Sequence, residues 1–529
     1  MKNMKLLHNA QVITQNPLQP TASALLIDHD RIVAVGETNS LFNHYPRAKG
    51  QDMGGRVIAP GLTDAHLHLK YYSLGLQKID CEVDTKAECL RRVAERVKNS
   101  KPGEWILGHG WNQNVWGTWP AASELDTIAA NNPVYLTAKS LHAAWANTPA
   151  LKLANIAPST PDPQNGQIQR DTQGNATGIL LETAMELVSR SIPESSINEI
   201  ADAIEKAQPI LWKMGLTGVH DFDRRDSFMA LQELHSQHKL KLRVLKNIPV
   251  ELLDEAHALG LRGGFGDDTL RIGNVKVFMD GALGPHTAAM FQPYVGEENN
   301  RGILNMDGEE LFEHGRKAAQ VGLGMTVHAI GDRANHEVLN AYEQLRKYEI
   351  ENHLPALRHR IEHVQVIHPD DAPRLGKLNV IASMQPIHAT SDMLMADQFW
   401  GERAKLAYAW KAQLDFGAPL AFGSDAPVES PNPFLGLHAA ITRRRADGSP
   451  SADGWYPEQK LSMPDAFAGY TTGAAYAACM EDRLGKLAPG FLADLIVLEK
   501  DPFTCNADEL LTLESSATMV GGEWVYSSF

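Results

Sequence analysis

The sequence predicts an α/β fold: a (β/α)8 TIM barrel with a small β-sandwich formed from both termini and a subdomain inserted after barrel strand one. Three observations predict it. The middle of the chain alternates strand-like apolar runs with helix-length amphipathic runs, and both termini are rich in short β segments. In addition, about 150 residues separate the first predicted barrel strand from the second, far more than a strand-to-helix connection needs. The 529 residues are enough for such a barrel with additions.

The terminal segments justify the small β unit. Runs at 24–27 and 31–35 flank the turn Asp28-His29-Asp30, and a further run at 57–59 follows Gly54-Gly55. At the other end, 492–498 is typical of a strand, and 517–526 is typical of a hairpin that turns at Gly521-Gly522. Residues 1–60 and 483–529 therefore supply strands that can pair into one β domain.

The central segment, 61–482, justifies the barrel. It contains eight apolar runs, the number of strands that closes a barrel. They lie at 62–68, 217–222, 241–248, 271–279, 324–330, 360–366, 380–386 and 420–425. Helices are expected between them, including 309–321 and 335–348, and a further helix at 463–480 after the eighth strand.

The insertion is expected at 70–205. It has a helix with Leu90, Val93 and Val97 on one face, a strand around 105–108, and a turn-rich stretch at 158–175. Because it follows the C-terminal end of strand one, where barrel enzymes carry their active sites, we expect it to act as a substrate lid.

Composition limits the partners. A net charge of −15, spread along the chain, favours solubility and argues against a nucleic-acid partner. The four cysteines form no CxxC pair, which indicates neither a disulfide framework nor a thiolate zinc site. No stretch approaches the roughly 20 apolar residues of a membrane span. We therefore expect a cytoplasmic protein with a small-molecule substrate and no membrane partner; a homodimer is compatible with the sequence.

The strongest chemical signal is the pair His66 and His68 in Pro60-Gly-Leu-Thr-Asp-Ala-His-Leu-His. The period of two of a strand sends both imidazoles to one face, where they can share an ion. An isolated pair is equally compatible with packing inside a barrel. Four further residues lie at the ends of strands four, five, six and eight, which meet at one rim of a parallel barrel: Lys276, His328, His363 and Asp425. Imidazole and carboxylate are ligands of zinc, iron and manganese.

Two of these residues have simpler explanations. A buried lysine such as Lys276 is more often ion-paired than a metal ligand. Asp425 lies in Gly-Ser-Asp-Ala-Pro, which is also typical of a turn. At the end of strand eight, however, its carboxylate can take a proton from water and return it to a departing amine, so Asp425 is the candidate catalytic residue.

This set of six residues resembles the metal signature of the amidohydrolase superfamily. The runs at 108–113, 144–151, 178–184, 275–281 and 328–334 resemble the amidohydrolase-3, or YtcJ-like, family, which includes N-substituted formamide deformylases. The resemblance implies a divalent metal, Zn²⁺ first, with one or two ions. It further implies that Lys276 is carbamylated by CO2 and bridges two ions. His66 and His68 would then bind one ion, and His328 and His363 would bind the other. The alternative is a site with a single ion, in which Lys276 is a charged neighbour.

The resemblance and the ligand set together indicate a metal-dependent hydrolase of non-peptide C–N bonds. It would be an amide, N-acyl or N-formyl amidohydrolase that uses metal-activated hydroxide. A deaminase or cyclic-amide hydrolase is the alternative; Lys276 and the run Ala-Ile-Gly-Asp after His328 weigh against it. A third interpretation is a catalytically silent regulatory or binding protein. Such a protein should have lost metal ligands, whereas all six positions here hold residues able to bind metal.

Weaker candidates for substrate binding surround this core, and each is equally compatible with a structural or solvent-facing role. Three lie at the end of a barrel strand or just past it: His220, Arg333 and His388. Three lie in the insertion: Trp111, Asn112 and His142. The family commonly has aspartate where Asn112 stands and a DGH-type triplet where Ser140-Leu141-His142 stands, so its substrate specificity is not carried over.

Overall fold

The computed structural model describes residues 4–140, 142–164 and 166–529. The chain divides into two compact units. Unit 1 takes the chain up to Tyr72 and from Ile204 to Phe529, and unit 2 is Ser73–Ala203. The chain passes between them in α2 (Leu69–Gly75) and α8 (Ile197–Lys213).

The centre of unit 1 is a near-closed barrel of eight parallel strands, as predicted. Neighbours along the sheet are also neighbours along the chain. The strands are β8 (Leu62–Leu67), β15 (Leu216–Asp221), β16 (Arg243–Pro249), β17 (Leu270–Phe278), β18 (Met325–Ala329), β19 (Arg360–His363), β20 (Ile381–Met384) and β21 (Leu420–Phe422). The parallel register places Phe278 beside His328 and Ala329 beside His363, so these C-terminal strand ends share one rim.

The first and last barrel strands meet just beyond their ends. The backbone N–H of Asp425 donates to the carbonyl of His66 at 2.7 Å, and the N–H of His68 donates to that of Ala426 at 2.8 Å. Gly423 makes this approach feasible, because a β-carbon there would lie 2.4 Å from the backbone nitrogen of His66. The seam therefore holds the first and last candidate ligands together.

Helices and short turns of 3₁₀ helix surround the barrel. They are α9 (Arg225–Ser236), η1 (Val250–Leu252), α10 (Leu253–Ala258), α11 (Gly308–Gln320), α12 (Asp332–Glu351), α13 (Arg374–Lys377), α14 (Pro386–Trp400), η2 (Gly401–Leu406), α15 (Trp410–Asp415), α16 (Pro433–Thr442), η3 (Pro457–Gln459), α17 (Met463–Gly469) and α18 (Thr472–Ala477). None of the helices in the described part of the chain is long and apolar enough to cross a membrane.

The single helix predicted at 463–480 is wrong, because two helices occupy this segment. The break at Thr471, whose φ and ψ are −125° and −91°, lies between α17 and α18. Each of the two helices contacts β21 closely through a glycine. A β-carbon at Gly469 would lie 2.4 Å from the Phe422 ring, and one at Gly473 would lie 2.0 Å from the Leu420 carbonyl oxygen. Packing against this strand therefore overrides the helical periodicity.

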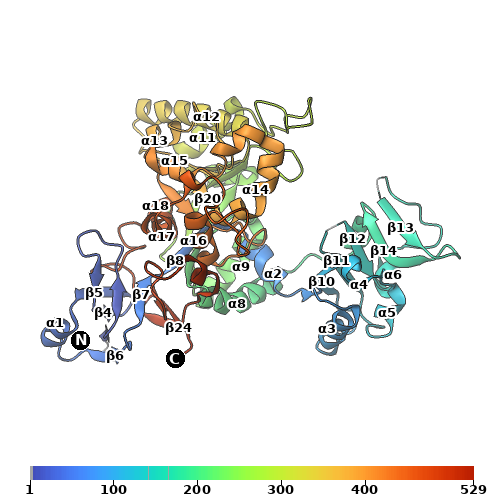
Figure 1. Ribbon diagram of the computed structural model, residues 1–529, viewed down its shortest axis with the longest axis horizontal. Helices are drawn as coiled ribbons and strands as arrows, with labels where there is room; N and C mark the ends of the chain where they lie inside the picture. Colours follow the sequence, from blue (N-terminus) through green and yellow to red (C-terminus); the bar gives the residue numbers. More distant parts are fainter. Residues whose placement is uncertain (1–3, 141, 165) are drawn as a thin grey trace. The chain divides into compact units, whose positions relative to one another are not determined.

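Strands from both ends of the chain share a sheet, because β7 pairs antiparallel with β22, with Ile58 opposite Val497. This six-stranded sheet runs β24 (Glu523–Ser527), β23 (Ala517–Val520), β22 (Leu495–Leu498), β7 (Val57–Pro60), β2 (Gln11–Ile13) and β3 (Thr21–Ala22) (Figure 1). A second sheet runs β5 (Arg31–Gly36), β4 (Ala24–Asp28), β1 (Lys5–His8) and β6 (Lys49–Asp52). Leu7 and Ile27 of the second sheet join Ile58 and Leu495 of the first in one buried cluster. Helix α1 (Thr38–His44) and η4 (Ala507–Thr512) complete the terminal segments.

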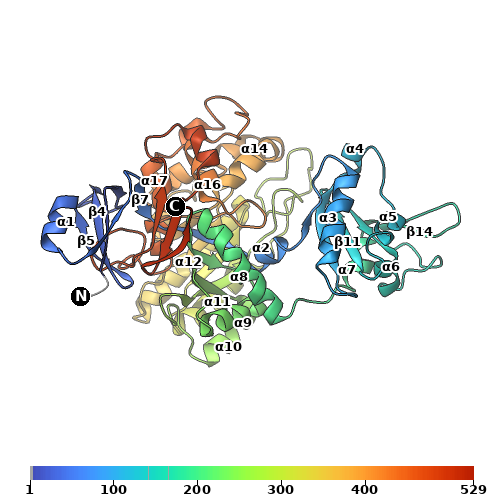
Figure 2. The same cartoon turned by 90° about the horizontal axis from the view of Figure 1, so that it is seen from below.

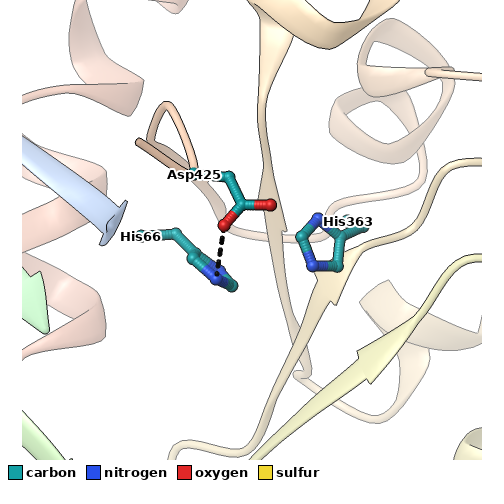
Figure 3. A group of neighbouring side chains, drawn as sticks. All are labelled: His66, His363 and Asp425. Atoms are coloured by element: carbon teal, nitrogen blue, oxygen red, sulfur yellow. Dashed lines mark ion pairs between the residues drawn. The ribbon is translucent and has the colours of Figure 1, made fainter. Parts of the chain in front are cut away.

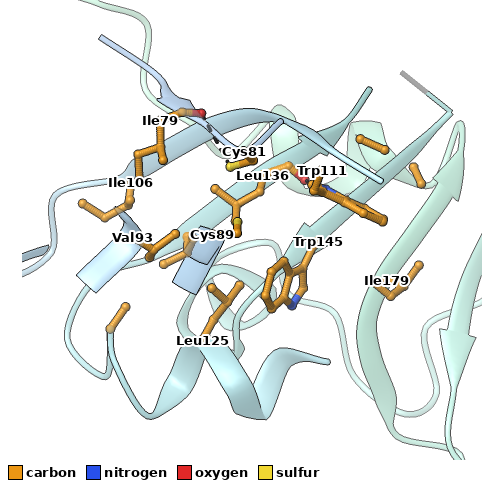
Figure 4. Packing of buried hydrophobic residues seen from close by; sticks show 14 residues of the cluster. Ile79, Cys81, Cys89, Val93, Ile106, Trp111, Leu125, Leu136, Trp145 and Ile179 are labelled. Carbon is orange, nitrogen blue, oxygen red and sulfur yellow. Dashed lines mark hydrogen bonds between the residues drawn. The ribbon is translucent and has the colours of Figure 1, made fainter. Parts of the chain in front are cut away.

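Unit 2 is a mixed six-stranded sheet with its own helices. The sheet runs β13 (Gly166–Arg170), β14 (Ala176–Glu182), β12 (Ala143–Ala146), β11 (Val134–Ala138), β10 (Ile106–Trp111) and β9 (Ile79–Asp80). The helices are α3 (Lys86–Lys98), α4 (Gln113–Trp116), α5 (Ala122–Asp126), α6 (Thr148–Leu153) and α7 (Met185–Ser189). Helix α3 packs on β9 and β10 (Figure 2). The buried core of unit 2 includes Val93, Trp111, Leu136 and Trp145 (Figure 4).

The turn-rich segment predicted at 158–175 is wrong over 166–170, where β13 pairs antiparallel with β14. Only Ile168 of this strand is buried, between two glutamines. A single apolar residue gives too weak an alternation to indicate a strand, and the apolar partner strand determines the pairing instead.

Candidate metal centre

Three side chains from three parts of the barrel rim meet in one cluster. His66 lies in β8, His363 ends β19, and Asp425 follows β21; each offers an atom within 4.8 Å of the other two (Figure 3). Asp425 lies in a loop, because β21 ends at Phe422 and not at 425 as predicted. The loop bends here, with a φ of +59° at Asp425, and Ser424 donates through both its backbone and its hydroxyl to Asp64.

Both imidazoles of the His66-Leu67-His68 motif direct Nε2 toward the same carboxylate. The distances from Asp425 Oδ1 are 3.5 Å to His66 Nε2 and 3.4 Å to His68 Nε2. The alternation of strand β8 and its closure against the loop after β21 produce this convergence. The arrangement brings two imidazole nitrogens and one carboxylate oxygen around one point.

The opposite nitrogen of each ring is held by a buried acceptor. His66 Nδ1 donates to Glu362 at 2.6 Å, and His68 Nδ1 donates to Asp223 at 3.0 Å. His363 Nδ1 donates to the side-chain oxygen of Gln385 at 2.8 Å. A proton fixed on Nδ1 leaves the lone pair on Nε2, the orientation that metal-binding histidines require.

Electrostatics keep the carboxylates of this centre ionised. Burial alone would raise the pKa of Glu362, but the Arg360 guanidinium and His66 hold it well below its usual range. Burial also opposes ionisation of Asp425, and again neighbouring imidazoles, His66 foremost, hold its pKa well below the ordinary value. Burial lowers the pKa of His66 to about 4, so its ring is neutral and its lone pair is available.

His68 differs, because two carboxylates flank it. Its burial opposes the charged form, but Asp223 and Asp425 raise the pKa of His68 to about 9. A cation that binds here must therefore displace a proton from this ring. The surplus of negative charge that holds the proton is the same surplus that would hold a metal ion.

Within the described part of the chain, Lys276 has no ion pair of the kind common for buried lysines. Its Nζ is buried and, among the described residues, has no hydrogen-bond partner. It lies over the rings of Phe222 at 4.8 Å and Phe278 at 4.6 Å, and burial lowers its pKa to about 8. An amine in this state has an appreciable neutral fraction near pH 7, which is the form that reacts with CO2.

His328 completes the rim beside His363, with ring centroids 4.6 Å apart. Its Nε2 lies 3.0 Å from the carbonyl oxygen of Gly281, to which it donates, so the lone pair is on Nδ1. Burial lowers the pKa of His328 to about 3, and the ring is neutral. All six residues predicted as ligands therefore lie at the C-terminal rim of one barrel.

A sequence model of the amidohydrolase family matches residues 49–526. The chain belongs to the amidohydrolase family. It is 34% identical to the protein LONG AFTER FAR-RED 3 of Arabidopsis thaliana, over 98% of this chain and 91% of the relative. It is 28% identical to an N-substituted formamide deformylase of Arthrobacter pascens, over 97% and 96% of the two chains. A crystal structure of an uncharacterized metal-dependent hydrolase from Pyrococcus furiosus superposes with a TM-score of 0.79 at 30% identity, covering 95% of this chain and 100% of that chain.

The donor set of this amidohydrolase fits a divalent metal. His66 and His363 present neutral imidazoles and Asp425 an ionised oxygen within one cluster, and His68 joins them once its proton is displaced. His328 and the orphaned Nζ of Lys276 lie at the same rim. Nitrogen and carboxylate donors of this kind suit zinc and other first-row ions. Carboxylates that hold Nδ1 of His66 and His68 are the usual companions of metal-bound histidine.

The other barrel candidates of this amidohydrolase have different surroundings. His220 is buried in the barrel, where its Nδ1 accepts from Arg360 at 2.9 Å. His388 is buried beside His363, with nearly parallel rings 6.2 Å apart. Arg333 is exposed near the start of α12. Of these three, His388 lies next to the metal centre, and the substrate contacts of all three stay predictions.

Within unit 2, Trp111 is fully buried and its indole N–H donates to the Leu136 carbonyl. Asn112 caps α4 by accepting from the backbone N–H of Asn114. His142 is exposed, with Nδ1 3.0 Å from Glu182. Leu141, the middle residue of the altered triplet, lies outside the described residues. Substrate binding by these residues stays a prediction.

Sequence reasoning missed the residues that hold the ligands: Asp223, Glu362 and Gln385. One signal was present for Glu362, because Arg360 and Glu362 alternate within an apolar strand and so share its interior face. A charged pair on that face of a barrel strand indicates a buried network. Asp223 and Gln385 lie just past strand ends, where spacing alone carries no such signal.

Proposed function

We propose that this protein is a metal-dependent hydrolase of non-peptide C–N bonds in small molecules, acting on an amide, N-acyl or N-formyl group. The observation that carries the proposal is the convergence of His66 Nε2 and His68 Nε2 on Asp425 Oδ1, with the other nitrogen of each ring fixed by a carboxylate. Support also comes from the relative named as an N-substituted formamide deformylase.

The residues proposed to hold the metal are those at the rim: His66, His68, Lys276, His328, His363 and Asp425. Zn²⁺ is the first candidate because it accepts imidazole and carboxylate donors in open sites. When bound, such an ion polarises a carbonyl group and makes water acidic enough to act as a nucleophile near neutral pH. Two ions require a carboxylate at position 276, which carbamylation of the neutral Lys276 amine by CO2 supplies; with one ion, Lys276 remains an amine.

Asp425 is the proposed proton carrier. Its pKa lies well below the ordinary value, so the carboxylate is ionised and can accept the proton of the attacking water. The same group then returns this proton to the nitrogen as the C–N bond breaks. Glu362 and Asp223 hold the two imidazoles that face Asp425, so the carboxylate keeps its position during the transfer.

A cavity of about 160 Å³ adjoins the centre within unit 1. His68 and Lys276 are among the residues that line it. Phe222, Phe278 and Tyr71 supply aromatic surface, and Arg224 and Glu251 line it as well. A cavity lined by aromatic surface and a few charged groups is in keeping with a small-molecule substrate.

The experiment that tests the proposal combines metal analysis with turnover. Purified protein is loaded with Zn²⁺, its metal content is measured by mass spectrometry, and a panel of N-formyl amines, N-acyl amines, cyclic amides and aminopurines is assayed. We expect one or two ions per chain and release of amine from the acyclic amides. Ammonia release from aminopurines alone would favour a deaminase. A protein that binds no metal and turns over nothing would be a silent regulatory protein.

A further inference from the structure

His388 has a buried polar atom that the centre described above does not use. It lies in the first turn of α14, directly after β20, and its side chain is 6% exposed. Among the described residues, its Nε2 has no hydrogen-bond partner. A buried ring nitrogen without a partner lowers stability, and a partner from outside the chain, such as a substrate, would remove this cost.

The tautomer of His388 follows from its other nitrogen. The side-chain amide nitrogen of Gln365 lies 3.4 Å from His388 Nδ1 and donates to it. Because Nδ1 accepts, the ring proton is on Nε2. His363 has the opposite arrangement, since its Nδ1 donates to Gln385. At Nε2, His363 therefore presents a lone pair, whereas His388 presents an N–H.

The His388 ring lies beside His363, one of the candidate metal ligands. The His363 and His388 rings are 6.2 Å apart and inclined by only 12°. Gln365 and Gln385, which orient the two rings, are both buried. This pair of glutamines leaves a lone pair on Nε2 of His363 and an N–H on Nε2 of His388.

We propose that His388 donates a hydrogen bond from Nε2 to the carbonyl oxygen of the substrate, and that Gln365 is a positioning residue that keeps the proton on Nε2. This inference rests on the proposed amide hydrolysis. The carbonyl oxygen gains negative charge as water adds to the carbon, so a preformed donor in a site with little water stabilises the transition state more than the substrate.

Two matched variants test the donor. In His388→Gln the amide nitrogen reaches the position of Nε2, whereas in His388→Asn it reaches only that of Nδ1. On the best amide of the panel we expect kcat to fall about 100-fold in His388→Asn, with KM changed less, and to recover at least about tenfold in His388→Gln. Metal content is expected to equal that of the wild-type protein in both. Wild-type kcat in His388→Asn would overturn the inference while leaving the amide hydrolase itself intact.

A second measurement does not depend on turnover. Zinc-loaded protein with ¹⁵N-labelled histidine is examined by NMR, and the His388 signals are identified by their loss in His388→Asn. We expect the Nε2–H tautomer in the wild-type protein and the Nδ1–H tautomer in Gln365→Glu, whose carboxylate accepts from Nδ1. An Nδ1–H ring in the wild-type protein refutes the inference even if no substrate is found, whereas absence of turnover with every amide refutes the proposed function.

Discussion

Glu362 Oε2 lies 2.6 Å from His66 Nδ1, and both side chains are fully buried at the centre of the barrel. The carboxylate also accepts from the Arg360 guanidinium and from the Thr326 hydroxyl. A buried charge is costly unless it is well hydrogen-bonded, and here three side chains, His66, Arg360 and Thr326, donate to Glu362. The network therefore fixes the orientation of one metal-facing ring.

Replacing Glu362 by Gln should weaken metal binding. The amide is neutral and a poorer acceptor for His66 Nδ1–H, so the lone pair on Nε2 becomes less basic and the ring less firmly oriented. We expect about a 10–100-fold loss of Zn²⁺ affinity in a chelator-competition titration. Glu349→Gln is the matched control, because Glu349 is equally buried and accepts from His359, a histidine outside the centre. Equal affinity loss in both variants would contradict the orienting role.

Replacing Asp425 by Asn should separate metal binding from proton transfer. The amide keeps an oxygen toward the imidazoles but cannot take a proton from water. We expect most of the metal to remain and kcat to fall by about 10²–10⁴-fold, measured by metal analysis and steady-state kinetics. The exposed Asp370→Asn should behave as wild type. Full activity of Asp425→Asn would refute the proton-carrier role.

Replacing Lys276 by Ala should report the number of ions. If a carbamylated Lys276 bridges two ions, its loss should halve the metal content per chain, because the second ion loses its shared ligand. The partly exposed Lys70, which pairs with Asp226, provides the control variant Lys70→Ala. Metal content is measured after dialysis against metal-free buffer containing bicarbonate. An unchanged ratio would favour one ion.

Acid should destabilise the protein through His359, which lies just before β19. Its Nδ1 accepts from the Met325 N–H at 3.0 Å, and its Nε2 donates to Glu349 at 2.8 Å. Burial lowers the pKa of His359 below 6.5, so its neutral form favours folding and its contribution is lost as the pH falls below 6.5. Burial would raise the pKa of Glu349, but the hydrogen bond from His359 helps to keep the pKa of this carboxyl lowered. The stability that Glu349 contributes is therefore lost only as the pH falls below about 4.5.

In His359→Gln the slope of unfolding free energy against pH between 6.5 and 5 should decrease by up to one proton, about 1.4 kcal/mol per pH unit. The exposed His238→Gln should leave the slope unchanged. Chemical unfolding at several pH values measures both. An unaltered slope in His359→Gln would show that His359 is protonated equally in the folded and unfolded chain.

Much of the barrel was predictable, because its signals are local. Each of the eight strands begins and ends within a few residues of its predicted bounds, since a buried parallel strand is a continuous apolar run. Two predictions outside the barrel strands failed because tertiary packing outweighs the local hydrophobic pattern. The helix breaks at Thr471, where Gly469 and Gly473 contact β21 closely. Strand β13 forms although Ile168 is its single buried residue.

The sequence by itself determined the rim of ligands, because residues at the ends of parallel barrel strands must meet whatever the loops between them do. His66, His363 and Asp425 are far apart along the chain, and strand order brings them together. Only the tertiary structure decided which nitrogen of each imidazole faces the centre. That choice depends on buried hydrogen bonds in which Glu362, Asp223 and Gln385 accept and Gln365 donates. Such contacts join residues whose spacing follows no period.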